Sequence, residues 1–216
     1  MSDRPFHHGN LRAALLDEAV VVLRESGVDG LSLRDLARRV GVSHGAPRSH
    51  FRDRQALLDA LAVFGFDRLT VQVRRELGQA DGLSDRFRRV AQAYVDFAID
   101  DSALMELMFQ AKVDGAAGGV DDAAAGLFDV LDQAAGPRTS GDIDTDARNQ
   151  FKLLFAATMQ GIATLVVSHR IERRQGERLV DAATATMLGS ELATRALTHD
   201  ETHASDASKI SRPRRR

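Results

Sequence analysis

Residues 31–51 of the chain read LSLRDLARRVGVSHGAPRSHF and contain the clearest structural pattern in the sequence. Apolar residues recur at helical spacing, and Ser32 precedes them as a helix N-cap with Asp35 three residues later. Gly41-Val42-Ser43 then interrupts the pattern, and its serine can cap a second short helix that runs to about Phe51. The stretch therefore predicts two short helices joined by a tight turn.

A longer helix is expected before this pair. Leu11, Leu15 and Ala19 form one apolar stripe, and Gly27 ends it. Three helices of these proportions are typical of a helix-turn-helix, whose second short helix enters a DNA major groove about 12 Å wide. An ordinary helical hairpin would share the turn glycine. Six arginines against two aspartates over residues 34–54, a net charge of +4, favour the DNA-binding interpretation.

The rest of the chain is also predicted to be helical. Apolar residues recur at helical spacing almost from end to end, and no stretch shows the sustained alternation of a β-strand, so we expect an all-α fold. Ser84 is the expected N-cap of the helix that carries Phe87 and Tyr94. The further helices are expected over residues 53–77, 84–98, 102–111, 121–135, 143–170 and 177–197.

The net charge of −2, from 29 basic and 31 acidic residues, hides an uneven distribution. Residues 100–146 hold eleven acidic and two basic residues, a net of −9, opposite in sign to residues 34–54. The absence of cysteine excludes disulfides, thiolate metal sites and cysteine nucleophiles. The N-terminal residues lack the apolar run of a signal peptide, and no 18 uncharged apolar residues occur in a row. We therefore expect a cytoplasmic protein with no membrane partner.

Several segments of the first 60 residues form one collinear pattern. They are His8-Gly9-Asn10-Leu11-Arg12, Gly27, residues 31–38, Gly41-Val42-Ser43, Ala46-Pro47, His50-Phe51 and Leu57-Leu58. This pattern resembles the TetR-type transcriptional regulators. The resemblance implies an N-terminal three-helix DNA-binding domain and a larger helical domain that binds a small ligand and dimerises. It also implies a repressor that binds a palindromic double-stranded DNA operator as a homodimer, with its recognition helices about 34 Å apart.

The resemblance assigns residues 43–49 to the recognition helix and places Ser32, His50 and Arg54 where the family contacts phosphates. The expected DNA-binding residues are Ser32, Ser43, His44, Gly45, Ala46, Pro47, Arg48, Ser49, His50 and Arg54. Arg48 departs from the family pattern, which usually has an aromatic residue there. An arginine can contact guanine bidentately, for about 1–3 kcal/mol of discrimination, or contact a phosphate, and both alternatives stand.

The resemblance divides the chain into a helix-turn-helix domain over residues 1–54 and a helical regulatory and dimerisation domain over 55–198. A basic tail over 199–216 has too few apolar residues to fold. The helices at 143–170 and 177–197 are expected to pair with their mates in a four-helix interface. Small residues suited to close approach there are Ala156, Ala157, Gly161 and Ala163.

The expected effector is a small apolar or aromatic molecule. Its candidate site is rich in Phe and Met, and residues of these types more often belong to the hydrophobic core than to a ligand site. The residues are Tyr94, Phe97, Met105, Met108, Phe109, Phe128, Phe155, Met159 and Gln160. Tyr94 and Gln160 carry the most information, because buried polar groups need partners and a ligand can be one. The segment 155–165 resembles a TetR C-terminal subgroup that has Trp and His-Gly where this chain has Phe155 and Gln160-Gly161.

The sequence contains only weak signals for a metal site or an enzyme. Asp142, Asp144 and Asp146 have the opening spacing of a calcium loop, but Ala147 and Leu153 stand where the turn glycine and the closing glutamate belong. Two adjacent histidines, His7 and His8, make a poor metal site. The common catalytic motifs are absent, so no metal, cofactor or enzymatic activity is expected. The alternative function is a helical ligand-binding or scaffold dimer without specific DNA binding.

Overall fold

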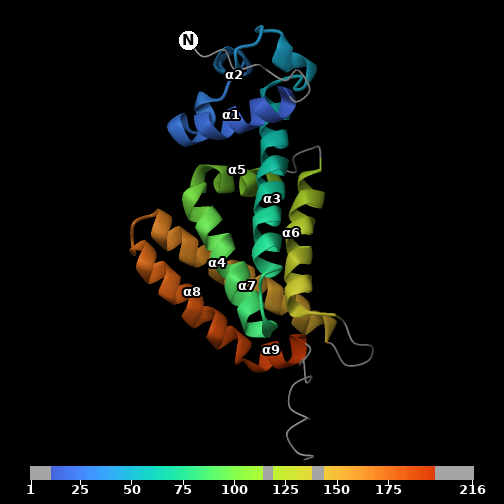
Figure 1. Cartoon of the computed structure of the whole chain (residues 1–216), viewed down its shortest axis with the longest axis vertical. Helices are drawn as coiled ribbons and strands as arrows, with labels where there is room; N and C mark the ends of the chain where they lie inside the picture. Colours follow the sequence, from blue (N-terminus) through green and yellow to red (C-terminus); the bar gives the residue numbers. More distant parts are fainter. Residues whose placement is uncertain (1–10, 114–118, 138–143, 198–216) are drawn as a thin grey trace, which may run out of the picture.

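The computed structural model describes residues 11–113, 119–137 and 144–197, and these residues form helices and no strand. The expected all-α fold is confirmed. A small head lies at one end of the molecule and contains α1 (Leu11–Ser26), α2 (Leu33–Val40) and the short 3₁₀ helices η1 (Val28–Gly30) and η2 (Ala46–Ser49) (Figure 1). A larger helical body follows it.

Helix α3 (Arg54–Leu77) connects the head to the body. Its 24 residues make a rod about 36 Å long. Asp53 caps its start by accepting a hydrogen bond from the backbone N–H of Ala56 at 2.8 Å. The helix contacts α1 near its start and then runs down the body beside α4, α5 and α6 (Figure 1).

The body is built from helices α4 to α9 around an apolar core. They are α4 (Gly82–Asp100), α5 (Ser102–Val113), α6 (Val120–Ala135), α7 (Thr145–Val167), α8 (Arg173–Leu188) and α9 (Glu191–Ala196). Phe87 of α4 is fully buried and meets Phe151 and Phe155 of α7 edge to face, at 5.4 and 5.2 Å between ring centroids. This cluster joins α4 to α7, and aromatic pairs of this geometry add to the apolar burial.

Three predicted helix boundaries are wrong. Helix α4 begins at Gly82 rather than at Ser84, and the side chain of Asp85 in its first turn accepts from the backbone N–H of Asp81 at 3.1 Å. The single helix expected over 177–197 is two helices, since Gly189 ends α8 and Ser190 caps α9. Helix α8 also begins earlier than expected, at Arg173.

Helix α7 begins at an aspartate of the rejected calcium pattern. Asp144 caps it by accepting from the backbone N–H of Ala147 at 2.9 Å. Asp142, the histidine pair 7–8 and the tail 199–216 lie outside the described residues. Within the described ranges, α7 is the one helix long and apolar enough to cross a membrane by length and composition. One side of it packs against α4, α8 and α9.

Candidate DNA interface and ligand cavity

The turn between α2 and the recognition segment, residues 43–51, has the predicted geometry. Ser32 Oγ accepts from the backbone N–H of Asp35 at 3.1 Å, which caps α2. Gly41 ends α2 at φ +79°, a left-handed conformation that favours glycine. The N–H of Val42 donates to the carbonyl of Ala37 at 2.9 Å, which closes the turn.

The helix within the recognition segment is shorter than expected. Ser43 does not cap a helix over 43–51, and η2 begins at Ala46 with 3₁₀ geometry and without a side-chain cap. Gly45 and Pro47 explain the difference, because glycine has low helix propensity and proline has no N–H to donate. The hydroxyl of Ser49 donates to the carbonyl of Ala46 at 2.7 Å and tightens the turn.

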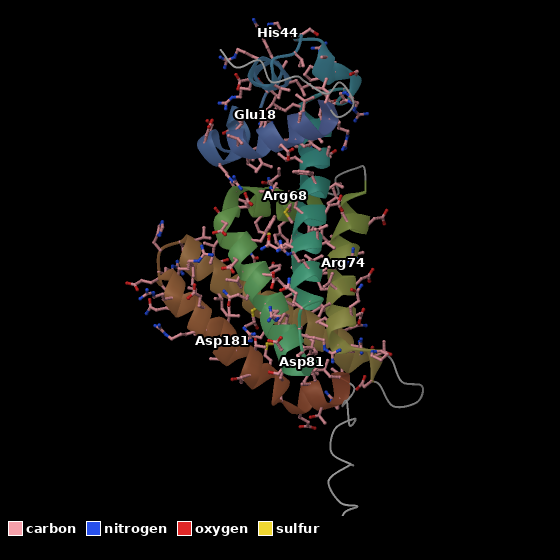
Figure 2. The ribbon with its side chains drawn as sticks, in the orientation of Figure 1. Glu18, His44, Arg68, Arg74, Asp81 and Asp181 are labelled. Atoms are coloured by element: carbon pink, nitrogen blue, oxygen red, sulfur yellow. The ribbon has the colours of Figure 1, made fainter. Side chains whose placement is uncertain are left out.

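The recognition segment exposes its polar residues and buries its apolar ones. Pro47 is buried and Phe51 is 2% exposed, and these two residues fasten the segment to the head. The guanidinium of Arg12 lies over the Phe51 ring, 5.6 Å from its centroid. The exposed residues of the segment are Ser43, His44, Gly45, Arg48, Ser49 and His50. His44 lies at the far end of the head, away from the body (Figure 2).

Arg39, one of the six arginines of residues 34–54, forms ion pairs within the head. Arg39 contacts Glu18 at 3.3 Å, Glu25 at 2.9 Å and Asp35 at 2.9 Å, so it joins α2 to α1. The hydrogen bonds that Arg39 donates to Glu25, Asp35 and Glu18 raise its pKa. Hydrogen bonds from Arg38 and then Arg39 hold the pKa of Asp35 below its usual value.

Arg54, an expected phosphate contact, also holds the head together. Its guanidinium donates to the backbone carbonyls of Leu31 at 3.1 Å and Val28 at 2.6 Å. In contrast, Arg34 and Arg48 are exposed and form no ion pair with the residues described. Within the head, α2 and the recognition segment therefore each present an exposed cation that is able to meet an anion.

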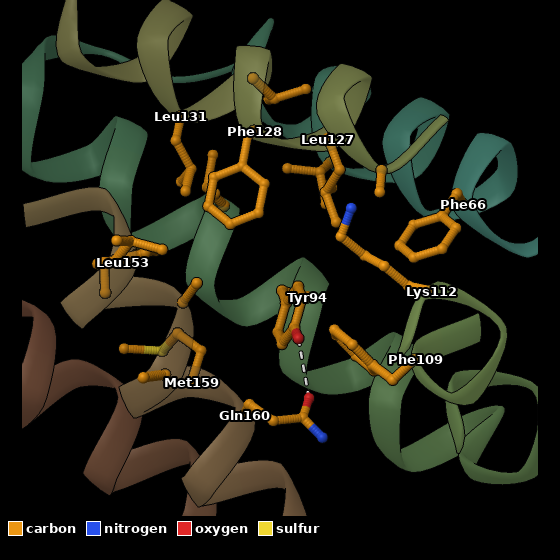
Figure 3. A pocket seen from close by; sticks show the side chains of 17 residues that line it. Phe66, Tyr94, Phe109, Lys112, Leu127, Phe128, Leu131, Leu153, Met159 and Gln160 are labelled. Atoms are coloured by element: carbon orange, nitrogen blue, oxygen red, sulfur yellow. Dashed lines mark hydrogen bonds between the residues drawn. The ribbon is translucent and has the colours of Figure 1, made fainter. Parts of the chain in front are cut away.

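The body contains an apolar cavity of about 400 Å³ (Figure 3). This volume lies within the range of about 300–1,000 Å³ that is usual for small-molecule sites. Helices α3 to α7 each contribute to its wall. The lining residues are Phe66, Val73, Val90, Tyr94, Phe109, Lys112, Ala124, Leu127, Phe128, Val130, Leu131, Leu153, Phe155, Ala156, Ala157, Met159 and Gln160.

Six of the nine candidate ligand residues line this cavity: Tyr94, Phe109, Phe128, Phe155, Met159 and Gln160. Phe97, Met105 and Met108 do not line it and are buried in the core, where Met108 packs close to Gly65 of α3. Sequence reasoning missed the contributions of α3 and most of α6. Their apolar spacing shows that a side faces inward but not which part of that side borders an opening.

Polar groups in the cavity wall are few. The hydroxyl of Tyr94 donates to Oε1 of Gln160 at 2.8 Å, which links α4 to α7 (Figure 3). Burial raises the pKa of Tyr94 above its ordinary value, so the phenol stays neutral at physiological pH. Lys112 is paired with the exposed Asp121 at 2.9 Å. The cavity thus offers an apolar volume with a neutral hydrogen-bonded pair in its wall.

An apolar surface runs along α7 and α8. Leu153 and Leu154 are 61% and 49% exposed on α7, and Leu179 is 41% exposed on α8. A shallow groove between the two helices includes Gly161. Ala163 was expected at this surface, but it is 1% exposed and points into the core.

The comparisons with known proteins agree with this architecture. The family profile described as "Bacterial regulatory proteins, tetR family" matches residues 15–61, which include most of the head and the start of α3. A second profile, described as "Tetracyclin repressor-like, C-terminal domain", matches residues 87–190. Together the two matches cover both parts of the molecule.

Individual relatives match a part or most of the chain. The class D tetracycline repressor of Escherichia coli is 42% identical over 52 residues, 24% of each chain, so this chain matches about a quarter of that repressor's length. A solved protein of unknown function from Rhodococcus sp. RHA1 is 41% identical, with a TM-score of 0.74, and the match covers 90% of this chain and all of that one. A TetR-family regulatory protein from Rhodococcus RHA1 has a TM-score of 0.63 at 16% identity, over 88% of this chain and all of the other, and shares the fold.

Proposed function

Because the chain belongs to the TetR family of bacterial transcriptional regulators, which bind DNA through a helix-turn-helix, we propose that it is a cytoplasmic, ligand-responsive repressor. It acts as a homodimer on a palindromic operator, and a small apolar or aromatic effector releases it. The observation that carries this proposal is the recognition segment, which is fastened by buried Pro47 and Phe51 and turns its polar residues outward.

The exposed groups of the head suit a DNA duplex. Ser43, His44 and Arg48 are exposed and carry hydrogen-bond donors that can reach base edges in the major groove. Ser32 uses its oxygen as an acceptor for the α2 cap, so its hydroxyl hydrogen remains able to donate to a phosphate. Arg34 adds an exposed cation on α2 that has no ion pair among the residues described. We assign Arg54 a supporting role, because two carbonyls already engage its guanidinium.

The apolar surface of α7 and α8 supports the homodimer. Exposed Leu179 lines the groove together with Gly161, which permits close approach of a second copy, and Leu153 and Leu154 are exposed further along α7. An isologous contact between two copies gives a two-fold axis, and the axis presents two recognition segments to successive major grooves. The operator is therefore a palindrome.

The apolar cavity supports the effector. A molecule that enters it exchanges contact with water for contact with an apolar wall, so apolar and aromatic compounds bind best. To release the operator, the effector must bind the DNA-incompetent conformation more tightly than the competent one. Coupling energies of this kind are typically about 1–3 kcal/mol.

Fluorescence anisotropy with the DNA that flanks the chain's own gene tests the proposal. We expect a dissociation constant of about 10⁻⁸–10⁻¹¹ M for a palindrome, weakening steeply as salt rises. Arg48→Ala should weaken specific binding. The matched control Arg74→Ala, on the part of α3 within the body, should not (Figure 2). Binding no tighter than to random DNA would instead support the scaffold dimer.

A further inference from the structure

A buried carboxylate lies where the head meets the body. Asp101 follows α4 and precedes α5, and its side chain is 6% exposed. Nε of Arg24 in α1 donates to its Oδ1 at 2.7 Å. On the other side, a guanidinium nitrogen of Arg68 in α3 lies 3.6 Å from its Oδ2. Helix α1 of the head and the connecting helix α3 therefore both contact one carboxylate of the body.

The second arginine is itself held in place. The guanidinium of Arg68 lies 5.7 Å from the centroid of Phe64 and 6.0 Å from the centroid of Phe97, so α3 and α4 are both in contact with it. Arg68 lies on α3 just below the head (Figure 2). A displacement of α4 along α3 would therefore change the position of Asp101 relative to both arginines.

Helix α4 also forms part of the cavity wall. Tyr94 of α4 lines the cavity, and Asp101 directly follows the last residue of the same helix. The N–H of Asp101 donates to the carbonyl of Phe97 at 2.9 Å, and its own carbonyl accepts from Met105 at 2.9 Å. Asp101 is thus fixed to the ends of both α4 and α5.

The pair between Arg24 and Asp101 is suited to holding an orientation. The Arg24 side chain is 50% exposed, so water screens the pair and its net contribution to stability is small. The carboxylate of Asp101, however, is buried, so water cannot hydrate it when Arg24 moves away. Separation of the head from this corner of the body would leave a buried charge with Arg68 as its remaining partner, which is costly.

We propose that Asp101 is a positioning residue that fixes the head relative to the body, and through it the separation of the two recognition segments in the dimer. The proposal rests on the function proposed above. It separates two properties of DNA binding, because a half-site needs one correctly folded head, whereas a full palindrome needs two heads at a set distance. Loss of the carboxylate should affect the palindrome alone.

The test compares Asp101→Asn with Asp85→Asn. Asp85 also pairs with two arginines, Arg88 and Arg89, but near the start of α4, the end of that helix away from the head (Figure 1). We expect Asp101→Asn to weaken binding to the full palindrome by about tenfold, within the usual range of coupling between sites. Its half-site affinity should stay that of the wild type, and Asp85→Asn should change neither. Equal losses on both DNAs, or no loss on the palindrome, would overturn the proposal.

A measurement without DNA distinguishes failure of this inference from failure of the proposed function. The chain has no cysteine, so Ser43→Cys and Asp181→Cys introduce two unique spin-label sites, one in the head and one in the body. Labelled chains diluted with unlabelled wild type report the distance between head and body. Asp101→Asn and Arg24→Gln should each broaden this distance distribution. An unchanged distribution would overturn the inference, whatever the wild type does on DNA.

Discussion

Asp132 of α6 offers the sharpest test of how the body is held together. Its Oδ1 accepts from Nε of Arg148 at 2.9 Å and its Oδ2 from Nζ of Lys152 at 2.8 Å. The Arg148 side chain is 2% exposed and that of Lys152 is 12% exposed. Arg148 also donates to the carbonyls of Asp132 and Gly136, so one guanidinium fastens α7 to the end of α6.

Asp132→Asn keeps the shape of the side chain and removes its charge. Two cations that are nearly out of water then lose their counter-charge, and breaking a buried pair in this way costs about 3–5 kcal/mol. Asp132 itself is 28% exposed, so water screens part of the interaction. We expect a loss of about 2–4 kcal/mol in the free energy of unfolding, and a fall in Tm of about 4–16 °C for a chain of this size.

The interactions of Asp132 with Arg148 and Lys152 also make the free energy of unfolding depend on pH in a defined direction. Burial alone would raise the pKa of Asp132, but hydrogen bonds from Lys152 and Arg148 outweigh it and leave the pKa below its ordinary value. A carboxyl whose pKa is lowered on folding stabilises the protein above its unfolded value of about 3.9, and that stabilisation is lost as pH falls through the folded pKa. The difference between wild type and Asp132→Asn should therefore be constant near neutrality and narrow below about pH 4.

Urea unfolding at fixed protein concentration, at pH 7 and again near pH 3, measures both effects. Asp129→Asn is the matched control, because Asp129 is exposed on the same helix and should change stability by less than about 0.5 kcal/mol. If the two substitutions cost the same at pH 7, or if the cost of Asp132→Asn persists undiminished in acid, the reasoning about this network is wrong.

Three further predictions concern the core, the turn and base recognition. Phe87→Ala should cost about 3–5 kcal/mol in urea unfolding because it empties a fully buried aromatic site, and Phe87→Leu should cost clearly less; equal costs would refute the packing argument. Gly41→Ala should cost about 1–2 kcal/mol at its φ of +79° and weaken operator binding, whereas an unchanged melting temperature would contradict the assigned turn. Arg48→Tyr should relax the preference for guanine at one operator position in a binding selection, and an unaltered preference would leave phosphate as its contact.

The head was largely predictable from its sequence because its signals are local. Ser32 and Gly41 each determine the conformation of their own few residues, and the structure has both as predicted. The recognition segment was predicted less well. Ser43 is a good N-cap residue by type, but Gly45 and Pro47 within the next four positions oppose a regular α-helix.

The cavity could be predicted only in part because its shape depends on packing between distant segments. Helical spacing placed Tyr94 on an inward-facing stripe, and Gln160 was a candidate because a buried polar group needs a partner. The structure brings the two together across 66 positions of sequence. The same spacing could not distinguish Phe97, which packs beside Arg68, from residues of the cavity wall. The exposed small residues of α7 were distinguished from buried Ala163 by the tertiary structure alone.

We propose that one dimer holds two outward-facing recognition segments against the two halves of a palindrome. Hydroxyl-radical footprinting of the operator is the direct test. We expect two protected regions related by two-fold symmetry, with centres about one helical turn of DNA apart, and loss of both regions with Arg48→Ala. A single protected region, or diffuse protection that Arg48→Ala leaves unchanged, would contradict it.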